Sequence, residues 1–162
     1  MTTPTEPQLS LHETLKPSMG AALGRVHRLW RAAINQAVGE LGMTEARWAV
    51  MMHLDKMGEG CTQQVLATEL AIEMPSLTRT LNQLEQQQLI ERRRDKTDRR
   101  VHCLWFTEQG REQVELLAVH IAQVRKDIYQ GLSDQQLDAF AEVLLSMEHN
   151  VRELLNNPEE SA

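Results

Sequence analysis

The spacing of apolar residues restricts most strongly what this 162-residue chain can fold into. Over most of its length apolar side chains recur at gaps of three and four, the period of an amphipathic helix. The exceptions are two short runs, Leu89–Arg94 and Val101–Phe106, and the second is rich in β-branched and aromatic residues, as strands are. The sequence therefore predicts a mainly α-helical fold with a small β-hairpin.

Composition agrees with one globular domain of ordinary size. Five prolines and eight glycines are too few for a turn-rich all-β fold. No apolar run approaches the roughly 18 residues that span a membrane, and the polar start of the chain does not resemble a secretion signal. Two cysteines make no disulfide framework. We expect a cytoplasmic protein without a membrane segment.

The organisation that we predict is a single domain over residues 12–155, between flexible tails at 1–11 and 156–162. Helices are expected over 12–41, 45–57, two short stretches starting near Thr62 and Pro75, 107–129, and from Ser133 onward. Three of them carry a narrow apolar stripe, which in a long helix needs a partner, often another chain. The stripes are Leu15, Met19, Ala22, Val26, Leu29, Ala33 and Ala37; Val114, Leu117, Ala118, Ile121, Val124 and Ile128; and Leu137, Phe140, Ala141, Leu144, Val151 and Leu155.

Charge is unevenly distributed. The net charge is −6, which by itself argues against a nucleic-acid partner. Residues 91–100, however, hold six Lys or Arg against three acidic residues. A DNA-binding face has to be basic only locally. A basic run of this kind can also be a solvated charged loop, and that alternative stays open.

Two short helices with a tight link, followed by a hairpin with a basic tip, form a winged helix-turn-helix. The second helix carries small polar residues that fit a major groove roughly 12 Å wide. Arg79 is the strongest candidate to read a base, because its planar fork can pair with O6 and N7 of guanine. Pro75 and Ser76 lie at the helix N-terminus, where free N–H groups favour a phosphate, and Thr78 and Thr80 can bond base edges. The alternative for Arg79 is a surface ion pair with Glu73 or Glu85.

At these residues the chain resembles the MarR-type transcriptional regulators, and within them the SlyA-like branch. The resemblance is carried by the stretch 71–85, Ala-Ile-Glu-Met-Pro-Ser-Leu-Thr-Arg-Thr-Leu-Asn-Gln-Leu-Glu. It is carried also by Asp98-Arg99-Arg100 and by Phe106-Thr107-Glu108-Gln109-Gly110. Trp105 departs from the pattern, since a charged residue is common at that position.

The resemblance implies a homodimeric, sequence-specific DNA-binding protein. Residues 12–42 and 108–155 would be dimerisation helices, and 44–107 the winged helix-turn-helix. Its second helix would enter the major groove of a pseudo-palindromic operator, and the wing the minor groove. Asp98 would orient an arginine by a salt bridge. The implied contact residues are Pro75, Ser76, Thr78, Arg79 and Thr80 on the helix, with Arg94, Lys96, Asp98, Arg99 and Arg100 in the wing.

Many members of that family bind small aromatic or phenolic acids and then release DNA. The resemblance therefore implies an effector site, with Trp30, Trp48 and Met52 as its candidate residues. Side chains of this kind also fill ordinary core space, and methionine adapts readily to it. From the residues alone core filling is the favoured interpretation, and the effector site is what the resemblance implies.

Two other functions are weighed against DNA binding. A winged fold can serve as a protein-interaction module, which the acidic net charge favours. An enzyme has little support, because the six histidines have no metal-ligand spacing and no catalytic constellation is visible. We expect no cofactor and no metal. If Leu104 and Phe106 face inward, Cys103 faces outward near Arg100, where a lowered thiol pKa would suit a redox switch. Cys61 lies at a helix start, where the helix dipole could stabilise its thiolate. For both cysteines an inert thiol is the favoured alternative, because no resolving cysteine is visible.

Overall fold

The computed structural model describes residues 10–156. The mainly helical fold with an antiparallel hairpin is confirmed. The elements, in order, are two short 3-10 turns, η1 (Leu11–Thr14) and η2 (Gly39–Leu41), on either side of α1 (Met19–Val38), then α2 (Glu45–Met57), α3 (Gln63–Glu69), α4 (Met74–Gln86), β1 (Ile90–Arg94), β2 (His102–Phe106), α5 (Glu108–Ile128) and α6 (Asp134–Asn156).

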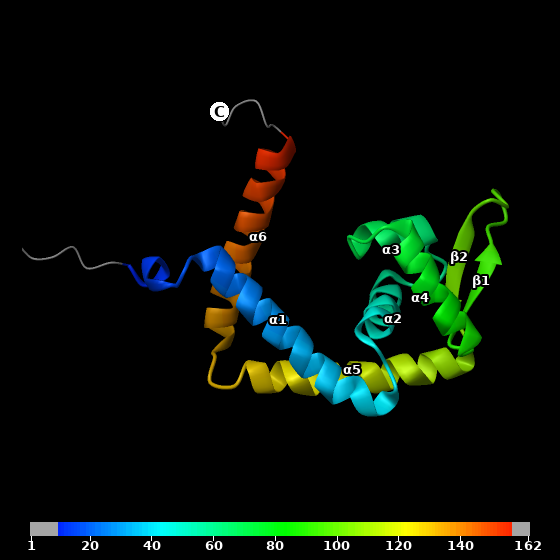
Figure 1. The fold of residues 1–162 in the computed structure, drawn as a ribbon, viewed down its shortest axis with the longest axis horizontal. Helices are drawn as coiled ribbons and strands as arrows, with labels where there is room; N and C mark the ends of the chain where they lie inside the picture. Colours follow the sequence, from blue (N-terminus) through cyan, green and yellow to red (C-terminus); the bar gives the residue numbers. More distant parts are fainter. Residues whose placement is uncertain (1–9, 157–162) are drawn as a thin grey trace, which may run out of the picture. The chain divides into compact units, whose positions relative to one another are not determined.

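The chain forms two compact units, one ending at Arg125 and the other beginning at Lys126. The boundary falls within α5, so the second unit consists mainly of α6. In the first unit, α2, α3, α4 and the hairpin pack together (Figure 1). Their centre is a set of fully buried side chains: Met51, Leu54, Leu66, Leu77, Leu81, Leu84, Leu104 and Leu117.

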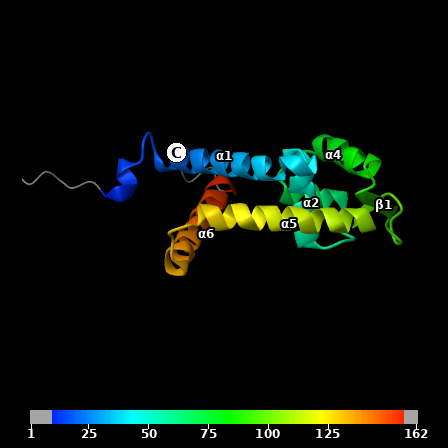
Figure 2. The same cartoon turned by 90° about the horizontal axis from the view of Figure 1, so that it is seen from below.

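The hairpin is tied to α3 as well as to itself. β1 and β2 pair antiparallel, with Arg92 opposite Leu104. On the other side of β2, Gly60 N–H donates to the Leu104 carbonyl at 2.7 Å, and Leu104 N–H donates to the Cys61 carbonyl at 3.0 Å. The turn before α3 thus forms an isolated backbone bridge to β2, and the hairpin lies beside α4 in both views (Figures 1 and 2).

Local signals set most helix starts. The Thr62 hydroxyl accepts from Val65 N–H at 3.2 Å and caps α3. Thr107 caps α5 by accepting from Gly110 N–H at 2.9 Å. At α6 the predicted capping box of Ser133 and Gln136 is present, with reciprocal bonds of 3.2 and 2.9 Å.

The first predicted helix is too long at its N-terminus. It was expected from about residue 12, but α1 begins at Met19, capped by Ser18, whose hydroxyl accepts from Ala21 N–H. The reason is Pro17, which has no N–H to donate and disfavours helical backbone in the residue before it. Thr44 also differs, because it stands at the N-cap of α2 without capping through its side chain. Its hydroxyl accepts instead from Arg47 Nε at 3.1 Å.

Gly110 explains part of the motif that follows the wing. A Cβ at this position would lie 1.8 Å from the Leu89 carbonyl oxygen. That same carbonyl accepts from Thr107 N–H at 3.1 Å, so the first turn of α5 lies directly against the end of α4 and the start of β1. Only glycine allows the backbones to approach this closely.

The three apolar stripes differ in how they are covered. On α5, Val114 and Leu117 are buried in the core of the first unit, whereas Ala118, Ile121, Val124 and Ile128 are only partly buried. On α1, Val26 and Leu29 are 56% and 70% exposed. In the second unit α6 buries none of its residues, and its exposed apolar side chains include Phe140, Val143, Leu144, Leu145, Val151, Leu154 and Leu155.

Candidate nucleic-acid interface

The helix α4 presents its N-terminal half to solvent. It follows a tight link in which Ala71 adopts a positive φ of 51°, and it begins with Glu73 at the N-cap and a proline in the first turn. Pro75, Ser76 and Arg79 are exposed, and Thr78 is half-buried. Small polar side chains and the exposed guanidinium of Arg79 therefore share the solvent-facing side of this helix.

Thr80 does not belong to that open face. Its side chain is buried, 7% exposed, and its hydroxyl donates to the Ser76 carbonyl at 3.2 Å. The cause is the helical period, because Thr80 is next to Leu77 and Leu81, which face the core. The sequence predicts that Thr80 faces outward with the other polar residues of this helix, and for Thr80 this prediction is wrong.

The wing tip is a hydrogen-bonded turn that carries basic side chains. Asp98 Oδ1 accepts from the backbone N–H of Arg100 at 3.0 Å and from its Nε at 3.2 Å. The Arg100 side chain is 91% exposed even so. The remaining basic residues of the tip, Arg94, Lys96 and Arg99, are also exposed. The geometry agrees with an aspartate that orients an arginine.

Two arginines of the basic run are engaged within the protein. Arg92 Nη2 donates to Glu85 Oε2 at 2.5 Å and to Asn82 Oδ1 at 2.6 Å, both on α4. Arg93 forms an ion pair with Glu91 and lies over the Trp105 ring, 4.8 Å from its centroid. Glu85, one of the two candidate ion-pair partners of Arg79, thus pairs with Arg92. No local sequence spacing indicates this pair.

The cysteines do not sit as a thiolate switch requires. Cys103 was expected to face outward but is buried, because residues 60–62 cover that side of β2. Its Sγ lies 3.9 Å from Asp95 Oδ2, to which it donates. Burial raises the pKa of the Cys61 thiol, and the nearby Cys103 adds to the effect. The suggested stabilisation of a Cys61 thiolate is therefore wrong.

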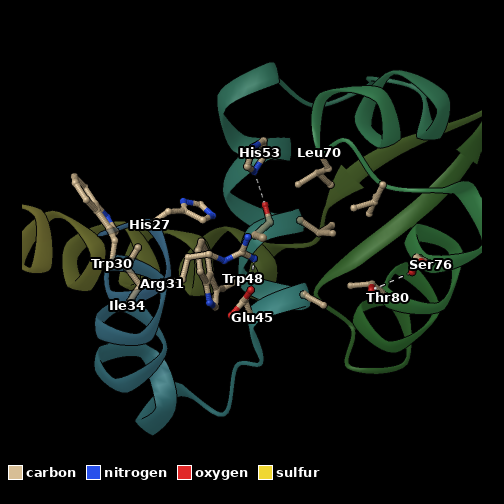
Figure 3. A pocket seen from close by; sticks show the side chains of 14 residues that line it. His27, Trp30, Arg31, Ile34, Glu45, Trp48, His53, Leu70, Ser76 and Thr80 are labelled. Carbon is tan, nitrogen blue, oxygen red and sulfur yellow. Dashed lines mark hydrogen bonds and ion pairs between the residues drawn. The ribbon is translucent and has the colours of Figure 1, made fainter. Parts of the chain in front are cut away.

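A cavity of about 760 Å³ lies behind the open face of α4 (Figure 3). Trp30 from α1 and Trp48 from α2 line it, as the sequence suggested, whereas Met52 does not. Ser76 and Thr80 of α4 form part of its wall. Any molecule held here would therefore touch the same helix that carries Arg79.

A polar network joins α1 to α2 along this cavity. Trp48 Nε1 donates to Asn35 Oδ1 at 2.7 Å, and Asn35 Nδ2 donates to Glu45 Oε2 at 2.6 Å. Arg31 forms an ion pair with Glu45. Within residues 10–156, the Nε of Arg31 is buried and has no hydrogen-bond partner. The Arg31 side chain as a whole is 40% exposed and lines the cavity, so it places a positive charge there.

Comparison with known proteins decides the family. The sequence profile of the MarR family matches residues 41–101. The crystal structure of the transcriptional regulator PA3341 is 30% identical with a TM-score of 0.77, and the match covers 83% of this chain and 98% of that one. The chain belongs to the MarR family of transcriptional regulators.

Other solved structures share this MarR fold. The transcriptional repressor CouR, bound to a 23-mer DNA duplex, is 28% identical with a TM-score of 0.74, over 87% of this chain and 99% of that one. BpsR of Bordetella bronchiseptica, whose DNA binding is described as regulated by 6-hydroxynicotinic acid, is 23% identical with a TM-score of 0.70, over 80% and 97%. SlyA, at 21% identity, shows the fold alone, so membership of the SlyA-like branch stays a prediction.

Among residues 10–156, no helix is both long and apolar enough to cross a membrane. In the same part of the chain, no three His, Cys, Asp or Glu side chains are grouped so that they could hold a metal ion.

Proposed function

We propose that this chain is a homodimeric, sequence-specific DNA-binding regulator that places α4 in the major groove and its wing in the minor groove of a pseudo-palindromic operator. The observation that carries this is the pairing of two exposed features in one packed unit. These are the open N-terminal half of α4 with Arg79, and a hairpin tip whose Arg100 is 91% exposed and held by Asp98. Such an arrangement fits adjacent grooves of one duplex.

Each contact residue has a role that follows from its placement. Arg79 would pair with a guanine edge, and Pro75, Ser76 and Thr78 would bring the helix N-terminus to a phosphate. Arg100 would enter the minor groove, where a narrow groove deepens the negative potential. The other exposed wing residues, Arg94, Lys96 and Arg99, would neutralise phosphates. Thr80 is left out of this set because it is buried.

A second copy of this chain is the partner proposed for the exposed apolar faces of α1 and α6. Leu29 on α1 is 70% exposed, and Phe140 and Leu155 on α6 are 52% and 73% exposed. Several large apolar side chains exposed on one helix, as on α6, are typical of an interface. Two copies would present two α4 helices to half-sites one helical turn apart, roughly 10 bp.

The cavity beside α4 is proposed as the site of a small aromatic acid that releases DNA. The two tryptophans supply flat apolar walls, and the partly exposed Arg31 side chain offers a positive charge to a carboxylate. BpsR, with its reported regulator 6-hydroxynicotinic acid, supports this ligand class. Bound ligand would push on Ser76 and Thr80, and so would change how α4 presents Arg79.

We further propose that the chain is not an enzyme and works in the cytoplasm. The family is one of transcriptional regulators, and PA3341, which is 30% identical, is a transcriptional regulator. Regulators of this kind act where the chromosome is. Turnover that is abolished by changing His102 or Cys103 would contradict this proposal.

Titration of two arginine variants tests the DNA contacts. Arg79→Ala should cost about 1–3 kcal/mol of binding and relax the preferred sequence, because one base-reading fork is lost. Arg100→Ala should weaken binding with less loss of preference, because the wing reads charge and groove shape. Arg125→Ala, an exposed arginine near the end of α5, is the matched control. Unchanged titrations for both wing and helix variants would contradict the assignment.

The effector is tested with 6-hydroxynicotinic acid and 4-hydroxybenzoate as probes. Binding in the cavity should change tryptophan fluorescence and lower the affinity for the operator. Arg31→Met should remove both effects while operator affinity without a probe stays near that of the parent. Fluorescence changes that survive Arg31→Met and Trp30→Leu together would place the ligand elsewhere.

A further inference from the structure

Arg92 differs from the other basic residues of the wing. Its side chain is 20% exposed, whereas that of Arg100 is 91% exposed. One terminal nitrogen, Nη2, reaches two acceptors on α4, Asn82 Oδ1 and Glu85 Oε2, at 2.6 and 2.5 Å. Arg92 thus points from the hairpin to the helix, not to solvent.

The two acceptors lie at a sensitive place on α4. Asn82 follows Arg79 by three residues, and Glu85 follows Asn82 by three, so all three are neighbours along one edge of the helix. Arg92 stands opposite Leu104, a fully buried residue of β2, so the strand behind it is fixed by the core. One guanidinium therefore joins the anchored part of the hairpin to the turn that follows Arg79.

The contact also controls a negative charge. The hydrogen bond from Arg92 lowers the pKa of the Glu85 carboxyl, with a smaller contribution from the charge of Arg92. An unpaired carboxylate beside a phosphate backbone would oppose binding. Arg92 keeps this carboxylate paired with a positive charge.

The opposite face of the hairpin has its own anchor. Trp105 lies between the Arg93 guanidinium, 4.8 Å from the ring centroid, and Gly60, where a Cβ would come within 3.1 Å of the ring. Gly60 N–H also donates to the Leu104 carbonyl. The hairpin is thus held to the turn before α3 on one side, and Arg92 is its polar link to α4 on the other.

We propose that Arg92 is a positioning residue that sets the angle between the wing and α4, so that the wing tip and Arg79 reach their grooves at the same time. The effect of Arg92 on operator binding rests on the proposed function. The link that Arg92 forms between the hairpin and α4 does not depend on that proposal.

The first test compares Arg92→Gln, Glu85→Gln and the double variant in operator titrations over a range of salt. Each single variant should weaken binding roughly three- to tenfold, because either one breaks the same charged contact. The double variant should lose little more than a single one. All three should keep the parent's dependence on salt, because Arg92 touches no phosphate.

A direct role in DNA binding makes the opposite prediction. If Arg92 contacted a phosphate, Arg92→Gln would reduce the log–log salt slope by about 0.9, and Glu85→Gln would strengthen binding by removing a negative charge. Either result overturns the proposal. Arg94→Gln is the matched control, since this exposed arginine should reduce the slope.

The second test needs no DNA and separates this inference from the proposed function. Hydrogen exchange of the hairpin amides should become faster in Arg92→Gln and in Glu85→Gln, while the amides of α2 stay protected and show that the fold is intact. Arg94→Gln should leave hairpin exchange unchanged. If no duplex binds the parent protein, the proposed function is contradicted, but hydrogen exchange of the hairpin amides still tests the contact between Arg92 and α4. If the hairpin amides of Arg92→Gln and of Glu85→Gln exchange at the same rates as in the parent protein, the inference is overturned.

Discussion

Asp95 shows how one side chain can organise the wing tip. Its Oδ1 accepts from the backbone N–H groups of Thr97 and Asp98 at 2.8 and 3.0 Å and from the Thr97 hydroxyl. Its Oδ2 accepts from Cys103 Sγ. These bonds to the ionised form, the Thr97 hydroxyl first among them, lower the pKa of Asp95 to about 2. The tip that carries Lys96, Arg99 and Arg100 thus depends on this carboxylate.

The hydrogen-bonded conformation of the wing tip should therefore depend on pH. The folded pKa lies below the ordinary value of 3.8, so the contribution of Asp95 is complete above that value and is lost as the pH falls toward about 2. The amide shifts of Thr97 and Asp98 in NMR spectra should titrate with a midpoint near 2. Asp95→Ala should abolish this transition. A midpoint at the ordinary value would mean that the turn is not bonded as described.

For single residues, the sequence predicts exposure or burial where the local helical or strand pattern determines it. The exposure of Ser76 and Arg79 follows from their place in the first turns of a short helix. The burial of Thr80 depends on which side the core covers, and the bond from Arg92 to Glu85 joins elements that only the fold brings together. The burial of Cys103 likewise depends on a strand-like pairing with residues 60–62. Contacts between distant segments leave no periodic signal.

At the scale of elements, turn and cap chemistry sets most boundaries. The cap residues Thr62, Thr107 and Ser133 mark the starts of α3, α5 and α6 as the sequence indicates. The start of α1 was missed because the apolar spacing runs on through Pro17, and the local effect of proline outweighs that spacing. The apolar spacing predicts where a helix lies along the chain, and local backbone restrictions such as proline determine its first residue.

Gly110 gives the clearest prediction at this scale. Gly110→Ala should destabilise the fold by about 1–3 kcal/mol, because the new Cβ would meet the Leu89 carbonyl and force the wing and α5 apart. The measurement is urea unfolding followed by circular dichroism. Gly39→Ala is the control, since that residue has helical backbone and no atom within 4 Å of the added Cβ. Equal stability of the two variants would contradict the close approach.

For the whole molecule, the exposed apolar faces predict the oligomeric state. We expect a dimer in sedimentation at micromolar concentration. Phe140→Asp should shift the protein toward a monomer, because a charge would be buried in the interface without a partner. Glu142→Gln, a polar residue of α6, should leave the dimer intact. A monomeric parent protein would remove the two-half-site geometry.

Taken alone, the net charge of the whole molecule argues against DNA binding, but the distribution of that charge does not. The chain carries a net charge of −6, yet Arg94, Lys96, Arg99 and Arg100 all lie exposed on one hairpin tip. Local positive charge can neutralise phosphates while the rest of the molecule is acidic. The number of phosphates contacted should therefore appear in the salt dependence of binding.

The most direct test of the central claim is selection from a pool of random duplexes with the purified chain at low and high salt. We expect enrichment of a pseudo-palindrome with half-sites roughly 10 bp apart, weaker at high salt. Binding without an enriched sequence would contradict base reading by Arg79. No binding even at low salt, by protein that has been unfolded and refolded to remove any bound effector, would contradict the account and favour a protein-interaction module.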